Sequence, residues 1–182
     1  MIFNASQTVQ DLLQNIHKGT RAAINLHSHD KDKMAVIAAQ LEEYFQPDAI
    51  TLDVSAYTSF DDLTRDLIMQ LLLRDDKPEN CRVADAAIET QSPKLLRRNV
   101  GRLLNSLSDQ KAWTCLILKN FDPAEEYWDD KACAWVRELV DTGKIPACVI
   151  LSAEPLSQIA DRPEGSSPLY NIFKMHLLEE EN

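Results

Sequence analysis

Lys33 has the sequence surroundings of a lysine that binds phosphate. It follows the apolar run 22–26, which predicts a strand, and it stands at the start of an amphipathic helix. Strand, eight-residue loop and helix form the layout of the motif G-x-x-x-x-G-K-[ST], whose backbone amides and lysine bind nucleotide phosphates and whose hydroxyl binds Mg²⁺. In that register His27 and Asp32 replace the two glycines, and Met34 replaces the Ser or Thr. The sequence therefore indicates the layout of a phosphate-binding loop in which only the lysine is kept.

The charge of this loop also opposes phosphate binding. Asp30 and Asp32 place two carboxylates where a triphosphate would lie. Coulomb repulsion at ~4–6 Å costs on the order of 1–4 kcal/mol for each pair of charges at an intermediate dielectric. Met34 offers no oxygen to a magnesium ion. Lys33 alone is equally typical of a surface lysine in the first turn of a helix.

The apolar run 113–118 predicts a strand that is covered on both faces. In a nucleotide hydrolase, such a strand ends in an aspartate that holds the metal, and an acid that orients the attacking water follows it. Lys119 stands at the position of the metal aspartate, and Asn120 cannot act as a base. Asp122 is the only acid nearby that could orient water, so it is the candidate catalytic residue if the chain is active. We expect no metal site.

Apolar runs and helical periodicities alternate along the chain. The expected strands are 22–26, 49–54, 113–118, 147–151 and 172–177, and the expected helices are about 6–18, 33–45, 59–73, 94–107 and 129–142. A helical turn or two is expected at 83–88, within a polar stretch that contains prolines. This alternation predicts one domain over residues 1–182, an α/β three-layer sandwich with a mainly parallel sheet of about five strands.

Composition limits the classes of function. Hydrophobic residues make up 45% of the chain and charged residues 26%, as in ordinary globular proteins. No apolar run approaches the roughly 18 residues of a membrane span, and the N-terminus shows no secretory signal, so we expect a cytoplasmic protein without membrane association. The net charge of −10 makes nucleic-acid binding an unexpected function. The four cysteines are too far apart for a C-x-x-C site.

His27 and His29 at the end of the first strand offer an alternative chemistry. Alternating histidines on a strand chelate zinc or manganese in metal-dependent hydrolases. Such sites draw more histidines and carboxylates from later strands, and only His17 and His176 remain in this chain. A loop that faces solvent is therefore the favoured interpretation of this pair.

Taken in order, these motifs resemble the core of a STAND/AAA-type P-loop ATPase, of the archaeal- and bacterial-ATPase or NACHT kind. The segments that carry the resemblance are Ile24-Asn25-Leu26 with Lys33, Thr51 to Ser55, Leu116 to Asp122, Val149 to Pro155 and Ser167 to Phe173. The resemblance implies a P-loop NTPase fold that binds ATP and magnesium. The chain departs from the pattern at the glycines, at Met34, at Lys119 and at Glu154, which replaces a sensor residue. The family's helical lid and winged helix would follow residue 182, and we expect them to be absent.

These departures predict a pseudo-ATPase that acts as a protein-interaction or regulatory module in a larger complex. We expect no cofactor, and a protein partner that is either an active ATPase relative or a component with a basic surface. Lys33, Asp32 and Met34 mark the degenerate phosphate loop, and Lys119 and Asn120 mark the degenerate metal position. The alternative is a weak ATPase that uses Lys33 for phosphate and Asp122 or Asp53 for water or metal. A nucleotide-binding switch without turnover is the third reading.

Overall fold

The computed structural model describes residues 7–74, 77–109, 115–121, 128, 130–156, 169 and 172–178 of the 182-residue chain. The helices are α1 (Gln7–His17), α2 (Lys31–Phe45), α3 (Phe60–Leu72), α4 (Pro78–Glu89), α5 (Pro93–Asp109) and α6 (Asp130–Asp141), with a 3₁₀ turn, η1, at Val54–Ala56. The strands are β1 (Ala22–His27), β2 (Ala49–Asp53), β3 (Cys115–Phe121), β4 (Ala147–Ser152) and β5 (Lys174–Leu177).

The five strands form one sheet in the order β2-β3-β4-β1-β5, and every neighbouring pair is parallel. This confirms the predicted α/β class and parallel sheet. The order differs from the common doubly wound orders 3-2-1-4-5-6 and 2-1-3-4-5. β4 lies at the centre of the sheet, and all six of its residues are buried. β2 and β5 form the two edges.

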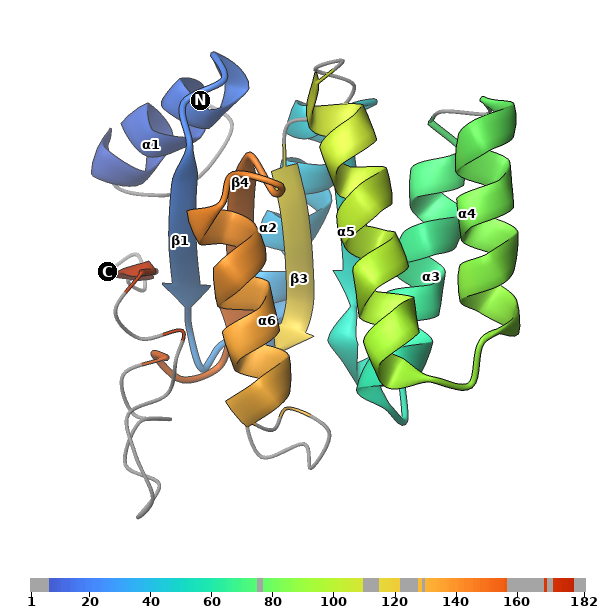
Figure 1. The fold of residues 1–182 in the computed structure, drawn as a ribbon. Helices are drawn as coiled ribbons and strands as arrows, with labels where there is room; N and C mark the ends of the chain where they lie inside the picture. Colours follow the sequence, from blue (N-terminus) through green and yellow to red (C-terminus); the bar gives the residue numbers. More distant parts are fainter. Residues whose placement is uncertain are drawn as a thin grey trace.

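Helices cover both faces of the sheet (Figure 1). Cys115 and Ile117 of β3 belong to a core cluster with α1 and α2, whereas Leu116 and Leu118 belong to a second cluster with α3 to α6. This alternation follows from the period of two along a strand. The three layers predicted from the sequence are therefore present.

The connection after β1 lies on one face of the sheet, and the connections after β2 and β3 lie on the other. α2, which follows β1, packs in the cluster with α1, while α3 to α6, which follow β2 and β3, pack in the opposite cluster. Right-handed crossovers require this arrangement, because β1 connects toward β2 and all later connections run back across the sheet. In open α/β sheets, ligands bind beyond the carboxyl ends of two neighbouring strands whose connections leave on opposite faces of the sheet. The carboxyl ends of β1 and β4 are therefore the first place to look for a site.

Two expectations about helices need correction. The polar stretch after residue 77 contains a full helix, α4, because Pro78 stands in its first turn, where the missing N–H costs nothing. The loop after β1 was expected to span eight residues, but only residues 28–30 separate β1 from α2. The other expected elements are present, with ends that shift by a few residues.

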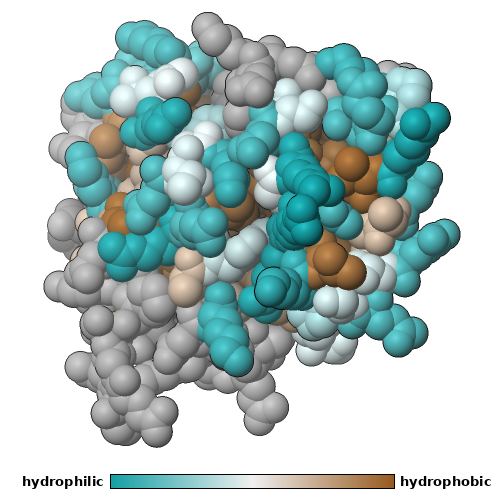
Figure 2. Space-filling view, in the orientation of Figure 1, coloured by the Kyte–Doolittle hydropathy of each residue, from teal (hydrophilic) through white to brown (hydrophobic). Residues whose placement is uncertain are grey.

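The face of the molecule drawn in Figure 2 is mostly hydrophilic. Apolar side chains appear there in small separate groups between polar ones, among the residues that the structure describes. Scattered apolar groups of this kind are ordinary for a protein surface. No described helix is both long enough and apolar enough to cross a membrane.

Candidate functional site

The turn between β1 and α2 is too short to wrap a phosphate. The Ser28 amide donates to the Ser152 carbonyl oxygen at 3.2 Å, which continues the β1–β4 ladder by one residue. The Ser28 hydroxyl accepts from the Asp30 amide at 3.2 Å, and α2 begins at Lys31. The prediction of an eight-residue loop was therefore wrong, because it followed the register of the phosphate motif rather than the start of the helix.

Asp30 fills the position at which the N-terminus of α2 would bind an anion. Its backbone is extended, and its carboxylate accepts a hydrogen bond from the Lys33 amide, with 3.0 Å between Oδ1 and N. This is an N-cap, in which a side-chain oxygen satisfies one of the free amides of the first turn. The same amides and the helix dipole bind phosphate in nucleotide-binding loops. Here the protein's own carboxylate takes that place.

The three residues predicted to mark the phosphate loop all lie on the first turn of α2. Lys33 donates from Nζ to the Leu178 carbonyl oxygen at 3.4 Å, so its ammonium group faces the segment that follows β5. Asp32 adds a second carboxylate to the first turn. Met34 is half-buried against the cluster formed by α1 and α2. The structure therefore brings them together, but in a helix rather than in a loop.

Asn25 links the carboxyl ends of β1 and β4. Its side chain is fully buried, and Nδ2 donates to the Ile150 carbonyl oxygen at 3.2 Å and to Ser152 Oγ at 2.8 Å. Its Oδ1 accepts from the Leu156 amide at 3.1 Å, while Ser152 Oγ donates to the Glu154 carbonyl oxygen at 2.6 Å. These bonds tie β1, β4 and the chain after β4 into one network. The polar groups at this position serve each other rather than a ligand.

The carboxyl end of β3 carries a bulge that redirects Lys119 and Asn120. The pairing with β4 shifts by one residue between Leu118 and Phe121, and Asn120 adopts a positive φ of 55°. Asparagine tolerates this left-handed conformation better than most residues. Bulges of this kind turn side chains away from their regular direction.

Both redirected side chains contact the protein itself. Asn120 Nδ2 donates to both carboxylate oxygens of Asp53, at 3.0 and 3.1 Å, and Lys119 Nζ lies 3.3 Å from Glu42 Oε1 on α2. Burial raises the pKa of Asp53, but hydrogen bonds from Asn120 and Ser55 and the charge of Lys119 outweigh it, so the pKa lies below its ordinary value. At the position that the sequence comparison assigned to a metal aspartate, Lys119 is thus a cation in an ion pair. Asp122, the candidate catalytic acid, lies outside the described residues.

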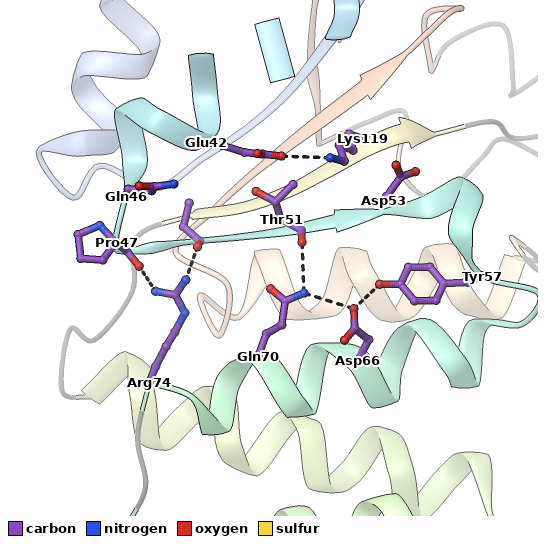
Figure 3. Close-up of a pocket in the computed structure, with 11 residues that line it drawn as sticks. Glu42, Gln46, Pro47, Thr51, Asp53, Tyr57, Asp66, Gln70, Arg74 and Lys119 are labelled. Atoms are coloured by element: carbon purple, nitrogen blue, oxygen red, sulfur yellow. Dashed lines mark hydrogen bonds and ion pairs between the residues drawn. The ribbon is translucent and has the colours of Figure 1, made fainter. Parts of the chain in front are cut away.

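A polar cavity lies along β2, on the outer side of the sheet (Figure 3). Its volume is about 480 Å³, and its lining residues are Glu42, Gln46, Pro47, Ala49, Thr51, Asp53, Tyr57, Asp66, Gln70, Arg74 and Lys119. Of this set, only Asp53 and Lys119 were candidate site residues from their sequence positions. Gln70 lies on α3 and Arg74 follows the end of that helix, and their spacing of four residues is the only sequence signal that relates them.

Histidines from two strands meet at the carboxyl end of β1. His29 Nδ1 lies 3.4 Å from Glu154 Oε1, and His27 is close enough to His29, His176 and Glu154 for their charges to affect its pKa. Burial lowers the pKa of His27 and of His176, and Lys174 lowers that of His176 further. Within the part of the chain that the structure describes, no three His, Cys, Asp or Glu residues are arranged to hold a metal ion.

These histidines predict a loss of stability in mild acid. In the folded protein, the pKa of His27 and that of His176 lie below the ordinary 6.5. The neutral histidines therefore contribute fully to the free energy of unfolding above pH 6.5, and this contribution is lost as the pH falls through their pKa values in the folded protein. We expect the melting temperature to fall between about pH 7.5 and about pH 5.5. The double variant His27→Gln, His176→Gln should show a flatter profile. Equal slopes of melting temperature against pH in the wild type and the double variant would contradict the assignment of this pH dependence to His27 and His176.

No family model and no curated protein matches this sequence.

Proposed function

We propose that this chain is a degenerate P-loop ATPase-like domain that binds no nucleotide. It acts as a protein-interaction or regulatory module of a larger cytoplasmic complex, beside an active ATPase relative or a component with a basic surface. The observation that carries the proposal is the hydrogen bond from the Lys33 amide to the Asp30 carboxylate. It places a negative charge where the phosphates would have to bind.

Three further contacts support this reading. Lys33 donates to the Leu178 carbonyl oxygen, so binding a phosphate would require this contact to break. Lys119 pairs with Glu42 at the place where a magnesium-binding aspartate would lie. Asn25 donates a hydrogen bond to Ser152 at the carboxyl ends of β1 and β4. The net charge of −10 favours a basic partner over nucleic acid.

The proposal predicts that Mg-ATP leaves the melting temperature unchanged. A nucleotide present at one hundred times its Kd would add about 2.7 kcal/mol to the free energy of unfolding, which for a chain of this size is roughly 5–10 °C. We expect no such rise at millimolar Mg-ATP, in the wild type or in Lys33→Ala. Differential scanning calorimetry measures this directly.

Two outcomes would favour the alternatives. If Mg-ATP raises the melting temperature of the wild type and Lys33→Ala abolishes this rise, the chain binds nucleotide, as in a switch without turnover. Phosphate release above that of the double variant Lys33→Ala, Asp122→Ala would establish a weak ATPase.

A further inference from the structure

The outer edge of β2 borders a groove that can take an extended chain. β2 is hydrogen-bonded to β3 on one side and ends the sheet on the other. The cavity of about 480 Å³ lies along this edge, with α2 and α3 as its walls (Figure 3). A second hollow of about 500 Å³ shares Pro47, Gln70 and Arg74 with the first. Cavities of roughly 300–1,000 Å³ are of the size that holds a ligand.

Side chains of α3 and of the turn that follows it donate hydrogen bonds to the carbonyl groups on this edge. Arg74 donates to the carbonyl oxygens of Pro47 and Ala49, and Gln70 Nε2 donates to the Thr51 carbonyl oxygen at 3.3 Å. Ala49 and Thr51 are alternate residues of β2, as expected for the outward side of a strand, and Pro47 lies two residues before Ala49. The donors stand where the amides of a neighbouring strand would stand. They can withdraw without breaking the β2–β3 ladder.

Exchange of these contacts for a peptide would conserve hydrogen bonds. Backbone amides of an added strand would replace the amide of Gln70 and the guanidinium of Arg74 at the same carbonyl oxygens. A typical hydrogen bond contributes little net free energy when one good partner replaces another. Strand addition at a sheet edge uses these backbone bonds for affinity and neighbouring pockets for specificity.

The charge of the groove selects a basic occupant. Its two hollows are lined by four carboxylates, those of Glu42, Asp48, Asp53 and Asp66, and by two cations, Arg74 and Lys119. Asp66 accepts hydrogen bonds from Tyr57 Oη and from Gln70 Nε2. No lysine or arginine among the described residues forms an ion pair with it.

A second copy of the chain does not fit this groove, because it would bring an equal set of carboxylates against the first. A partner segment with lysine or arginine removes the like-charge repulsion and supplies the missing cation.

One end of the groove adds an apolar contact. Leu73 lines the second hollow and is 87% exposed, the largest exposure among the large apolar side chains that the structure describes. Asp66 lies on α3, and Leu73, seven residues later, is the C-cap of that helix. Seven residues span about 10 Å along a helix, which is about three residues of extended chain. The occupant therefore needs a basic side chain and an apolar side chain separated by about two to four residues.

From these contacts we propose that β2 binds an extended basic segment of a partner protein by strand addition, with a lysine or arginine on Asp66 and an apolar side chain on Leu73. This deepens the proposed interaction role and rests on it. The β2 edge and α3 make the recognition surface.

The test uses a displayed library of random peptides selected on the full chain, followed by synthesis of the best binder. We expect the selected peptides to be enriched in lysine and arginine, and the binder to shift the amide resonances of Ala49 and Thr51. Asp66→Asn should weaken binding by about three- to tenfold, and Asp66→Lys should abolish it. Glu43→Gln removes the same charge from an exposed position outside the groove, and it should change affinity by less than about twofold.

A proline at Thr51 tests the strand geometry. Thr51→Pro removes an outward amide at an edge position, where proline is tolerated, and should weaken binding by about tenfold or more. If this variant fails to fold, the charge reversal at Asp66 still decides the question.

Selection of acidic peptides, resonance shifts confined to other surfaces, equal affinity in Asp66→Lys, or dimerisation through β2 would each overturn the inference. Peptides that bind elsewhere would leave the interaction role intact, whereas nucleotide binding would refute that role without bearing on the groove.

Discussion

Replacing Asn25 by leucine is expected to lower the free energy of unfolding by about 3 kcal/mol. The change removes the hydrogen bonds that the Leu156 amide, the Ile150 carbonyl oxygen and Ser152 Oγ form with Asn25. All of these groups lie in the interior, where a lost hydrogen bond exposes the full cost of desolvation. Urea unfolding of the purified chain measures the effect.

Asn105→Leu supplies the matched control for this experiment. Asn105 is exposed on α5, so the same chemical change there should alter stability by less than about 0.5 kcal/mol. If Asn25→Leu unfolds with the same free energy as the wild type, this hydrogen-bond network does not stabilise the carboxyl ends of β1 and β4. The carboxyl ends of β1 and β4 would then again be a candidate ligand site.

Replacing Phe60 by alanine is expected to cost about 3–4 kcal/mol. Phe60 follows the N-cap Ser59 and begins α3, and it packs edge-on against Trp128 and Trp135, with ring centroids at 5.3 and 5.4 Å. The Arg97 guanidinium lies 5.0 Å from the centre of its ring. Truncation would leave a cavity and remove these aromatic contacts together.

Phe60→Leu keeps much of the volume and should cost less than about 1.5 kcal/mol. The measurement is again urea unfolding, with the slope of the transition as a check that the unfolded state is unchanged. Equal losses in the two variants would contradict the packing argument, since both lack the ring but only one leaves a large void.

The helices and strands could be predicted because their signals are local. The apolar run Ala147–Leu151 and the Ser59 cap of α3 each identify an element without reference to the rest of the chain. The order of the strands could not be predicted, because it depends on contacts between residues more than a hundred positions apart, such as Asn25 with Ser152. Nothing near either residue in the sequence indicates that pairing.

The degenerate loop shows how a motif can mislead. Aspartate followed by a helical pattern is an N-cap signal, and Asp30, which directly precedes the helix, fits it. The register of the phosphate motif instead placed residues 27–34 in one loop. The local capping interaction decided the structure, because the glycines that would keep a longer loop open are missing.

The groove along β2 could not be predicted from side-chain types. Its acceptors are backbone carbonyl oxygens of Pro47, Ala49 and Thr51, which carry no sequence signal. Likewise, the bulge that turns Lys119 toward Glu42 depends on the pairing of β3 with β4. Both features follow from tertiary arrangement rather than from local propensity.

The most direct test of the central claim is the amide resonance of Lys33 during a titration with Mg-ATP. The Asp30 carboxylate holds this amide at 3.0 Å, so we predict that the resonance stays in place up to millimolar nucleotide. A saturable shift of the amides of Lys31, Asp32 and Lys33 would show that phosphate displaces the carboxylate. That result would contradict the account and restore the nucleotide site.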